Sequence, residues 1–271
     1  MGPSGSRLRR VFRPGSLHRI QARYQSRIVR PLRRDGLDDL AHILPAASVR
    51  AVIDVGVHLG NASADYLRVF PSARVIGVEA DARSTPQLRS RFAAEPRYEL
   101  VEAAAAAVDG ERRTFYALPD SGTSSLQTPL EDQARTHADV VEVPTVSIDA
   151  LCAQRGIETV DLLKVDVEGA EIEVLRGAEG LLRSSAIRAV YAEARFIRET
   201  EGGVLVHELA AFLAPFGYRL HNLYDQVESA ARGTIYANAV FLGPAEEAAL
   251  VERTNDRVFV QRLARVVDPG R

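Results

Sequence analysis

The segment LLKVDVEGAE, residues 162–171, begins as an apolar strand and ends in charged side chains. Alternate residues of a strand share a face, so Lys164 and Asp166 project together and Glu168 follows at the carboxyl end. A carboxylate there can orient a reacting group or take its proton, and an ammonium group can stabilise negative charge that develops beside it. Glu171 falls in the first turn of the next helix, where an acid favours the helix dipole whatever the chemistry.

Lys164 is the only lysine among the 34 lysine and arginine residues of the chain. Its ammonium group is a compact charge that can lose a proton, whereas a guanidinium is a larger planar fork that stays charged. This difference is a physical reason to keep one lysine in an arginine-rich chain. We therefore take Lys164, Asp166 and Glu168 as candidate catalytic residues. The alternative is that Lys164 and Asp166 form a buried structural pair that supports the loop.

Short β-branched segments alternate with helical ones from residue 50 onward. The patterns predict strands at 51–56, 73–80, 98–108, 112–118, 160–168, 187–194, 218–225 and 236–243. They predict helices at 61–70, 84–94, 169–184 and 204–217, and a strand at 140–154 that turns into a helix capped by Ser147. The expected fold class is α/β, with a doubly wound, mostly parallel sheet and an antiparallel strand at its end. Ligands of such sheets bind beyond the carboxyl ends of the strands, where segment 162–171 places its acids.

The chain has 271 residues, 46% of them hydrophobic, which suits one sizeable domain with appendages. We expect a basic N-terminal extension at 1–45, the main domain at 46–245 and a C-terminal helix or tail at 246–271. The first 34 residues carry ten arginines and no acid, which suits either a solvated extension or contact with a membrane surface. The net charge of −2 gives no general attraction to nucleic acid.

No apolar run reaches the length of a signal peptide or a membrane span, and Cys152 is the single cysteine. These features predict a cytoplasmic protein without an intramolecular disulfide.

A glycine-containing loop, IDVGVHLGNAS, follows the first predicted strand and opens the first helix. Its glycines are Gly56 and Gly60, but His58 stands where the dinucleotide fingerprint requires a third glycine. Glu79 follows at the end of the second strand, where an acid can accept hydrogen bonds from both ribose hydroxyls. This combination indicates a nucleoside cofactor without a diphosphate, of which S-adenosylmethionine is the common example. The alternative is a plain βαβ unit in which these residues only form turns.

Other strand ends add candidate cofactor contacts. Asp54 ends the first strand and could hold the amino-acid part of the cofactor, while Ala80 follows Glu79 directly. Glu102 and Ala103 end the third strand, where an adenine ring would lie. The small residues of 103–107 leave room for a flat ring, although close packing of a helix on the sheet would use the same residues.

The motifs IDVGVHLG, VIGVEAD, VEAAAAAVDG, SGTSSL, VPTVSIDAL and above all DLLKVDVEGAEIEVLRGA resemble the FkbM family of S-adenosylmethionine-dependent methyltransferases. The resemblance covers roughly residues 48–243. It implies a class I methyltransferase (Rossmann-like) fold and methyl transfer, typically to a hydroxyl of a sugar, polyketide or related small molecule. The chain departs from the family at His58, which is usually asparagine, and at Glu102, where a small amide is common.

Transfer to a hydroxyl requires a positioned acceptor and the loss of its proton. We expect Asp166 to act as base or orienter and Lys164 to pair with it or stabilise the developing alkoxide. His137, in the polar loop 119–138, could swing over the acceptor as an alternative base. Glu193 ends the strand after the lysine strand and could contact the substrate or, with Asp166, bind a divalent ion, but no spacing compels a metal. Residues 123–125 of the SGTSS segment could bind cofactor or acceptor.

Three other functions remain open at this point. They are a nucleoside-binding protein without methyl transfer, an oxidoreductase that binds a dinucleotide, against which His58 argues, and an N-methyltransferase. The expected partner is a small-molecule or glycan acceptor. The acceptor pocket is expected from residues 119–139 and 195–235, which contain no motif that identifies the acceptor.

Overall fold

The computed structural model describes residues 36–118, 124–127, 139–197 and 203–254. His137 and Thr123 therefore lie outside the described residues. Residues Asp35–Ala249 form one compact unit, and the remainder of the chain forms a second unit of which only residues 250–254 are described.

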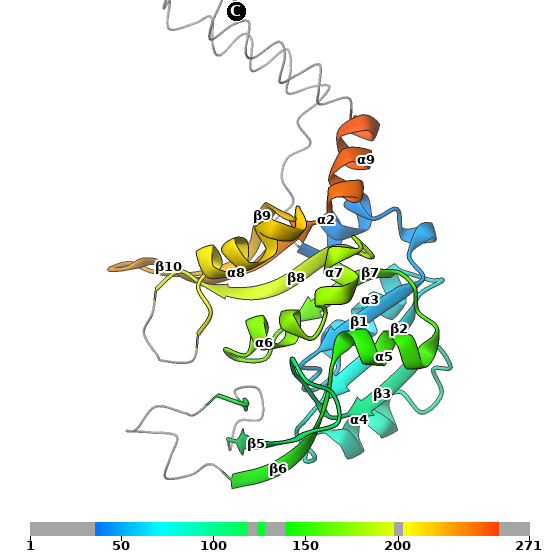
Figure 1. Ribbon diagram of the computed structural model, residues 1–271, viewed down its shortest axis with the longest axis vertical. Coiled ribbons are helices and arrows are strands. Elements are labelled where there is room, and N and C mark those ends of the chain that lie inside the picture. The colour runs from blue at the N-terminus through cyan, green and yellow to red at the C-terminus, as the bar shows by residue number, and fades with distance from the viewer. Residues whose placement is uncertain (1–35, 119–123, 128–138, 198–202, 255–271) are drawn as a thin grey trace, which may run out of the picture. The chain divides into compact units, whose positions relative to one another are not determined.

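A seven-stranded sheet forms the centre of the compact unit (Figure 1). Its strand order is β3-β2-β1-β7-β8-β10-β9, and the first five strands run parallel while β10 is antiparallel to both of its neighbours. In that order the strands are Tyr98–Glu102, Arg74–Glu79, Ala51–Val55, Val160–Val165, Ile187–Arg195, Gly233–Leu242 and Arg219–Ser229. The predicted doubly wound sheet with an antiparallel end is confirmed.

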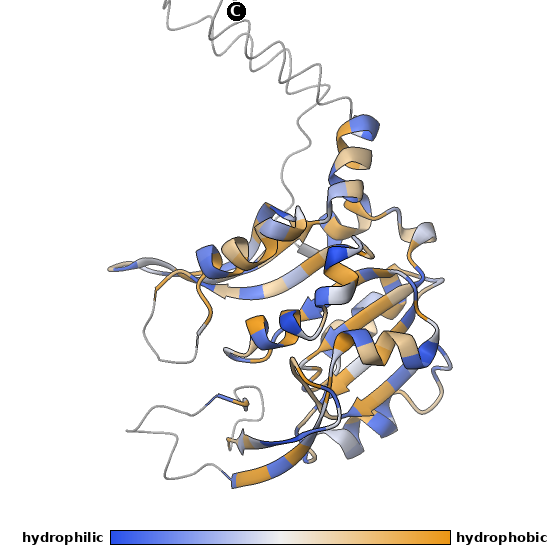
Figure 2. Ribbon diagram, viewed as in Figure 1, coloured by the Kyte–Doolittle hydropathy of each residue, from blue (hydrophilic) through white to orange (hydrophobic). Residues whose placement is uncertain are grey.

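Helices pack on both faces of this sheet. Ile53, Val55, Leu163 and Val165 face the core beneath α5 (Ile148–Arg155), α6 (Glu171–Arg176), α7 (Glu179–Arg183) and α8 (Val206–Leu213). On the other face α3 (Asn61–Val69) contacts β1 and β2, and α4 (Thr85–Arg91) contacts β3. Figure 2 shows hydrophobic residues along the central strands, as expected for parallel strands covered on both sides.

Several elements begin or end at capping residues that the sequence signals. The hydroxyl of Ser147 accepts a hydrogen bond from the backbone N–H of Ala150 at 3.2 Å, which caps α5 as predicted. The helix ends at Gly156, which has a left-handed backbone. Helix α8 continues into the 3-10 turn η3 (Ala214–Phe216), which ends at Gly217.

The predicted strand 98–108 is shorter than expected, because the chain leaves the central sheet after Glu102. Residues 104–105 form β4, which pairs with Thr145 and Val146 of β6 (Asp139–Val146). With β5 (Arg112–Ala117) these strands make a separate three-stranded sheet. The alanine tail thus belongs to a second sheet, which period-two patterning alone does not reveal.

The predicted helix 169–184 is two short helices, α6 and α7. Asp149 explains the break, because its carboxylate accepts the backbone N–H groups of Gly180 at 2.7 Å and Leu181 at 3.0 Å. These amides would otherwise bond within one continuous helix. Gly177 lies between the two helices and against residues 106 and 147. A Cβ at this position would fall 2.2 Å from the carbonyl oxygen of Ala106.

The compact unit begins at Asp35, earlier than the predicted boundary at residue 46. Helix α2 (Gly36–Ile43) buries Leu40 and Ile43, and the Tyr224 hydroxyl donates to the Asp39 carboxylate. The 3-10 turn η1 (Ala46–Ser48) then leads into β1. At the other end α9 (Pro244–Thr254) follows β10. No helix within the described ranges has both the length and the apolar character needed to cross a membrane.

Candidate active site

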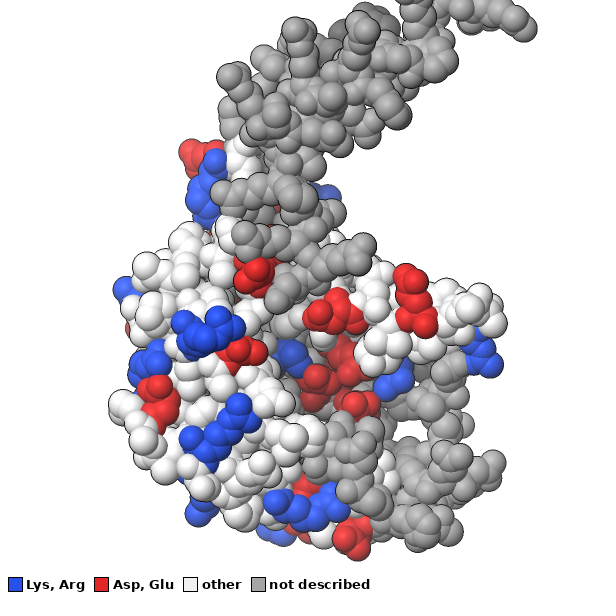
Figure 3. Space-filling model, turned by 180° about the vertical axis from the view of Figure 1, so that it is seen from behind, with Lys and Arg blue, Asp and Glu red and all other residues white. Residues whose placement is uncertain are grey.

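A cavity of about 300 Å³ opens at the carboxyl ends of the parallel strands. It lies where β1 has β2 on one side and β7 on the other, which is the switch point of a doubly wound sheet. Its lining comes from the ends of β1, β2, β7, β8 and β10 and from residues 103–105 and 124–126. On the face shown in Figure 3, acidic side chains gather around a hollow with basic side chains beside it.

Gly56 joins the two halves of this cavity. Its backbone has a φ of +82°, and a Cβ at this position would lie 1.8 Å from the carbonyl oxygen of Asp166. The loop after β1 therefore contacts the loop after β7 directly, and only glycine permits this approach. The amide of Gly56 also donates to the Val78 carbonyl of β2 at 3.0 Å.

Glu79 lines the cavity at the end of β2, and only 7% of its surface is exposed. One carboxylate oxygen accepts the backbone N–H of His58 and the other accepts that of Asp81, each at 2.7 Å. Burial raises the pKa of Glu79, while these two hydrogen bonds act in the opposite direction. His58 lines the cavity and has a left-handed backbone with a φ of 52°. Ala80 and Ala103 line it as well.

Three predicted cofactor residues, Asp54, Gly60 and Glu102, lie outside the cavity lining. Gly60 faces α4, where a Cβ would be 2.7 Å from the ring of Phe92, so its glycine serves helix packing. Glu102 points outward from the end of β3 and forms an ion pair with Arg89. Gly60 and Glu102 therefore do not line this cavity, and their contact with a cofactor stays a prediction.

Asp54 is completely buried and does not line the cavity either. Its Oδ2 atom accepts the hydroxyl of Ser63 on α3 at 2.5 Å, and Oδ1 has no partner among the described residues. Burial raises the pKa of Asp54 to about 6, although the charge of Lys164 lowers it. Asp54 thus belongs to a buried charged group beneath the site and not to its surface.

Lys164 stands beside Asp54 in the register of β1 and β7. Its ammonium group donates to Oδ2 of Asp166 at 2.8 Å and lies 6.0 Å from the centre of the Tyr191 ring. Burial alone would lower the pKa of Lys164, but Asp166 and Asp54 outweigh it and raise the pKa above its ordinary value. The expected alignment of Lys164 and Asp166 on one strand face is present, and Lys164 is held as a charged group below the cavity floor.

Asp166 and Glu193 form a carboxyl pair that shares a hydrogen bond. Burial would raise the pKa of Asp166, but Lys164 and a hydrogen bond with Glu193 lower it below its ordinary value. Burial and the adjacent Asp166 raise the pKa of Glu193 to about 9. At neutral pH Asp166 is therefore ionised, and Glu193 carries a proton that it donates to Asp166.

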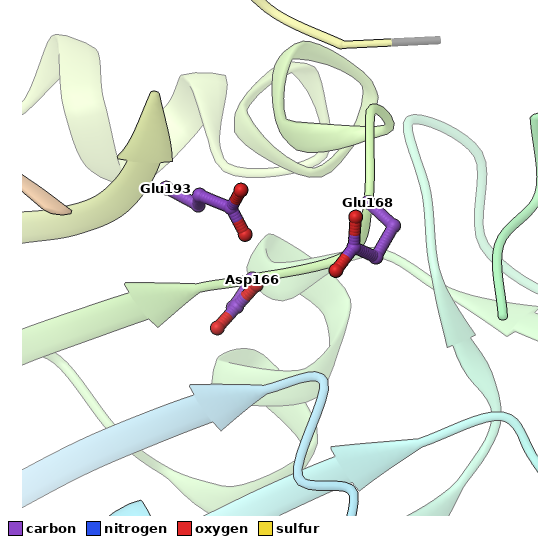
Figure 4. A group of neighbouring side chains, drawn as sticks. All are labelled: Asp166, Glu168 and Glu193. Carbon is purple, nitrogen blue, oxygen red and sulfur yellow. The ribbon is translucent and has the colours of Figure 1, made fainter. Parts of the chain in front are cut away.

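Glu168 faces Glu193 from the loop after β7 (Figure 4). Its backbone has a φ of 54°, which is uncommon for a residue with a side chain, and Gly169 follows with a φ of 105°. The Ser125 hydroxyl contacts the carbonyl oxygen of Glu168 at 3.0 Å and holds this loop. The Glu168 carboxylate pairs with Arg195 at 3.0 Å. The site thus gathers the candidate catalytic residues Lys164, Asp166 and Glu168.

A family model described as the methyltransferase FkbM domain matches residues 54–220, which is more than half of the chain. The chain belongs to the FkbM methyltransferase family. The sheet order and the family together establish the class I methyltransferase fold.

Two characterised proteins of very different lengths are similar in sequence to this FkbM chain. The 2-O-methyltransferase NoeI of Sinorhizobium fredii is 27% identical over 153 residues, which cover 52% of this chain and 62% of NoeI. The AMB antimetabolite synthetase AmbE of Pseudomonas aeruginosa is 25% identical over 263 residues, covering 85% of this chain and 12% of AmbE. The chain thus spans less than two thirds of either relative. Among solved structures, fibrillarin of Aeropyrum pernix has a TM-score of 0.43 at 15% identity, covering 72% of this chain and 68% of fibrillarin.

The FkbM site could hold a cation only in competition with groups already present. One oxygen each of Asp166, Glu168 and Glu193 lies within 4.8 Å of the others, a spacing that a divalent ion can bridge. Arg195 already pairs with Glu168, Lys164 pairs with Asp166, and the raised pKa of Glu193 keeps its proton in place. A bound ion would have to displace these partners.

Glu171 holds the loop of the FkbM site from below. It is 2% exposed, and its Oε1 atom accepts the backbone N–H groups of Gly169 at 3.1 Å and Val167 at 3.3 Å. Burial raises the pKa of Glu171 from 4.5 to about 7. The sequence indicated only a favourable position at the helix start, so the hydrogen bonds to the loop are an addition from the structure.

The raised pKa of Glu171 predicts a pH-dependent stability. Between pH 4.5 and 7 the folded protein retains a proton that the unfolded chain releases, so the free energy of unfolding falls as the pH rises through this window. A Glu171→Gln variant keeps an Oε1 acceptor without a charge. On going from pH 4.5 to pH 8, we expect the free energy of unfolding of this variant to rise relative to that of the wild type by up to about 3 kcal/mol. Urea unfolding of both proteins across this range measures the difference, and parallel curves would contradict the prediction.

Sequence reasoning missed two residues that line the far side of the cavity, Tyr236 and Asn238. Both lie on β10, whereas the acceptor pocket was expected from segments 119–139 and 195–235. The polar Asn238 within the otherwise apolar run ANAVFL is the signal that could have identified this strand. Glu193, by contrast, lies at the site as expected.

Proposed function

We propose that this protein is an S-adenosylmethionine-dependent methyltransferase that acts on a hydroxyl group of a small molecule or glycan. The observation that carries the proposal is that one cavity is lined by Glu79 on one side and by Asp166 and Glu193 on the other. Glu79 is a buried carboxylate of the kind that can accept hydrogen bonds from ribose hydroxyls, and Lys164 pairs with Asp166 beneath the cavity. Membership of the FkbM methyltransferase family supports the reaction class. The 2-O-methyltransferase activity in the name of NoeI supports a hydroxyl acceptor.

The chain's residues suit the cofactor. Each carboxylate oxygen of Glu79 accepts one backbone N–H and retains a lone pair, so the two can accept the two ribose hydroxyls. Ala103, Ala104 and Ala105 leave a smooth, small-residue wall for an adenine ring. His58 occupies the position of a phosphate-binding glycine, which favours a cofactor without a diphosphate.

The cofactor supplies a methyl group on a positively charged sulfur. Asp166, held ionised by Lys164, accepts a hydrogen bond from the acceptor hydroxyl and orients its oxygen. The lowered pKa makes Asp166 a weak base, which is sufficient because the hydroxyl proton becomes strongly acidic once the oxygen has bonded to the methyl carbon. Positioning two reactants in this way can supply roughly 7–11 kcal/mol of the barrier reduction.

Calorimetric titration followed by a transfer assay tests the proposal. We expect micromolar binding of S-adenosylmethionine and none of NAD, since the dinucleotide fingerprint is interrupted at His58. With methyl-labelled cofactor, label is expected in alkali-stable ethers of hydroxyl acceptors. Transfer only to amines would replace the proposal by N-methylation. Cofactor binding without transfer to any acceptor would favour a nucleoside-binding protein, and binding of NAD would favour an oxidoreductase.

A further inference from the structure

A row of polar side chains runs from Asp166 across the next two strands, β8 and β10. Asn238 of β10 stands directly opposite Glu193 of β8 in the antiparallel register, and Glu193 is hydrogen-bonded to Asp166. Tyr236 lies two residues before Asn238 and therefore on the same face of the sheet. All four residues line the cavity, so the row extends it beyond the catalytic pair on the side away from Glu79.

A β-bulge fixes the orientation of Asn238 in this row. Tyr236 pairs with Val227 of β9 but Asn238 pairs with Tyr224, so β9 has an extra residue here. Asp225, in the bulge, has a left-handed backbone with a φ of 51°. Its Oδ2 atom accepts the side-chain amide of Asn238 at 3.1 Å, which leaves the amide carbonyl of Asn238 to the cavity.

Tyr191 supports the same bulge from the adjacent strand. Its hydroxyl donates to Oδ2 of Asp225 at 2.9 Å, and its ring lies near the ammonium group of Lys164. The position of Asn238 is therefore built from the same group of residues that holds the catalytic lysine. Such support is expected for a binding residue and unnecessary for a solvated surface amide.

The charge of the cavity restricts what can bind there. Among the described residues that line it, four are acids (Glu79, Asp166, Glu168 and Glu193) and none is a lysine or arginine. Within the described ranges, the cations next to the lining are paired with acids: Lys164 with Asp166 at 2.8 Å, Arg195 with Glu168 at 3.0 Å, and Arg83, which contacts Ser124, with Asp81 at 2.6 Å. A phosphate at this position would meet carboxylates and would find no free cation in the described lining.

We propose that Glu193, Asn238 and Tyr236 form the acceptor subsite, and that it takes an uncharged, hydroxyl-rich acceptor such as a glycoside in preference to a sugar phosphate or nucleotide sugar. This proposal rests on the proposed function. Glu193 and Asn238 bind hydroxyls, and the ring of Tyr236, which is 37% exposed, offers an apolar face to the carbon face of a sugar. The methyl transfer then follows the glycosyl transfer that removes the sugar from its phosphate carrier.

The charge preference is tested with a matched panel of acceptors. Methyl glycosides of the common hexoses and 6-deoxyhexoses are each compared with the corresponding sugar 1-phosphate and nucleoside diphosphate sugar, using methyl-labelled S-adenosylmethionine. We expect kcat/KM for the uncharged acceptor to be higher by about tenfold or more. Equal or better use of the phosphorylated forms would overturn the preference while leaving the proposed function intact. No transfer to any member by protein that binds the cofactor would overturn both.

The subsite is tested with variants of Tyr236 on the acceptor that the panel identifies. Tyr236→Ala is expected to raise the acceptor KM by roughly tenfold, whereas Tyr236→Phe, which keeps the ring, stays close to the wild type. The cofactor Kd should not change in either variant. Val227→Ala is the matched control, because Val227 is 39% exposed, stands opposite Tyr236 and does not line the cavity. An equal rise of KM in the Val227 variant would overturn the assignment.

Discussion

Replacement of Lys164 by methionine is expected to lower kcat for methyl transfer by about a hundredfold or more, with little change in the Kd for S-adenosylmethionine. Methionine fills much of the same space but removes the ammonium group that donates to Asp166. Asp166, Asp54 and Glu193 would then share a buried region without that charge, and the pKa of Asp166 would rise. A protonated Asp166 accepts the hydrogen bond of the acceptor hydroxyl only as a neutral acid, and it cannot take the proton of that hydroxyl.

The cofactor affinity should persist because Lys164 does not line the cavity. Lys164→Arg retains the charge but must place a larger planar group where Lys164 is only 6% exposed. Its kcat should therefore lie between that of the Lys164→Met variant and that of the wild type. The measurements are steady-state kinetics and calorimetry on the same preparations.

Loss of a buried ion pair also destabilises a protein, so the Lys164 variants need a control for folding. Arg188 provides one at the opposite end of the same strands, where it pairs with Asp161 at 2.7 Å and with Glu246 at 2.7 Å. Arg188→Met should lower the melting temperature and leave kcat at the wild-type value. A methionine variant of Lys164 with normal turnover would show that Lys164 forms only a structural pair.

A Glu79→Gln variant is expected to weaken S-adenosylmethionine binding by about a hundredfold, as judged from the loss of two charge-assisted hydrogen bonds. Glutamine is not a conservative change here. Both oxygens of Glu79 accept backbone N–H groups, so the amide NH2 would face either that of His58 or that of Asp81. The remaining oxygen could serve only one ribose hydroxyl. Calorimetric titration measures the Kd directly.

Glu102 is the matched control for Glu79. The two residues stand opposite one another in the register of β2 and β3, and both end their strands. Glu102 points outward to Arg89, so Glu102→Gln should bind S-adenosylmethionine as the wild type does. If the Glu102 variant lost affinity and the Glu79 variant kept it, the cofactor side of the cavity would be assigned to the wrong strand.

The sequence specified the parallel sheet and the alignment of Lys164 with Asp166, because both follow from periodicity within single strands. It could not separate residues of the same type whose roles depend on tertiary contacts. Gly56 and Gly60 lie in one loop, yet the first contacts the loop after β7 and the second packs on Phe92. Glu79 and Glu102 both end strands, yet only the first turns into the cavity.

Local sequence patterns also could not predict features that depend on residues far away in the sequence. The split of segment 169–184 depends on Asp149, which caps α7 from another helix. The proposed acceptor subsite depends on the register of β10 against β8, which places Asn238 opposite Glu193. The sequence placed Glu193 at the correct edge of the sheet because it ends a parallel strand, but β10 runs in the opposite direction.

The contact between Gly56 and the carbonyl oxygen of Asp166 limits how proteins with this architecture can diversify. Any side chain at position 56 would push the ends of β1 and β7 apart and would displace the proposed cofactor and catalytic residues together. Tyr236 on β10 reaches the cavity without passing through that junction, so its side chain can change without moving the ends of β1 and β7 apart. If the proposed acceptor subsite is correct, a change of acceptor would involve Tyr236 and leave the junction of β1 and β7 in place.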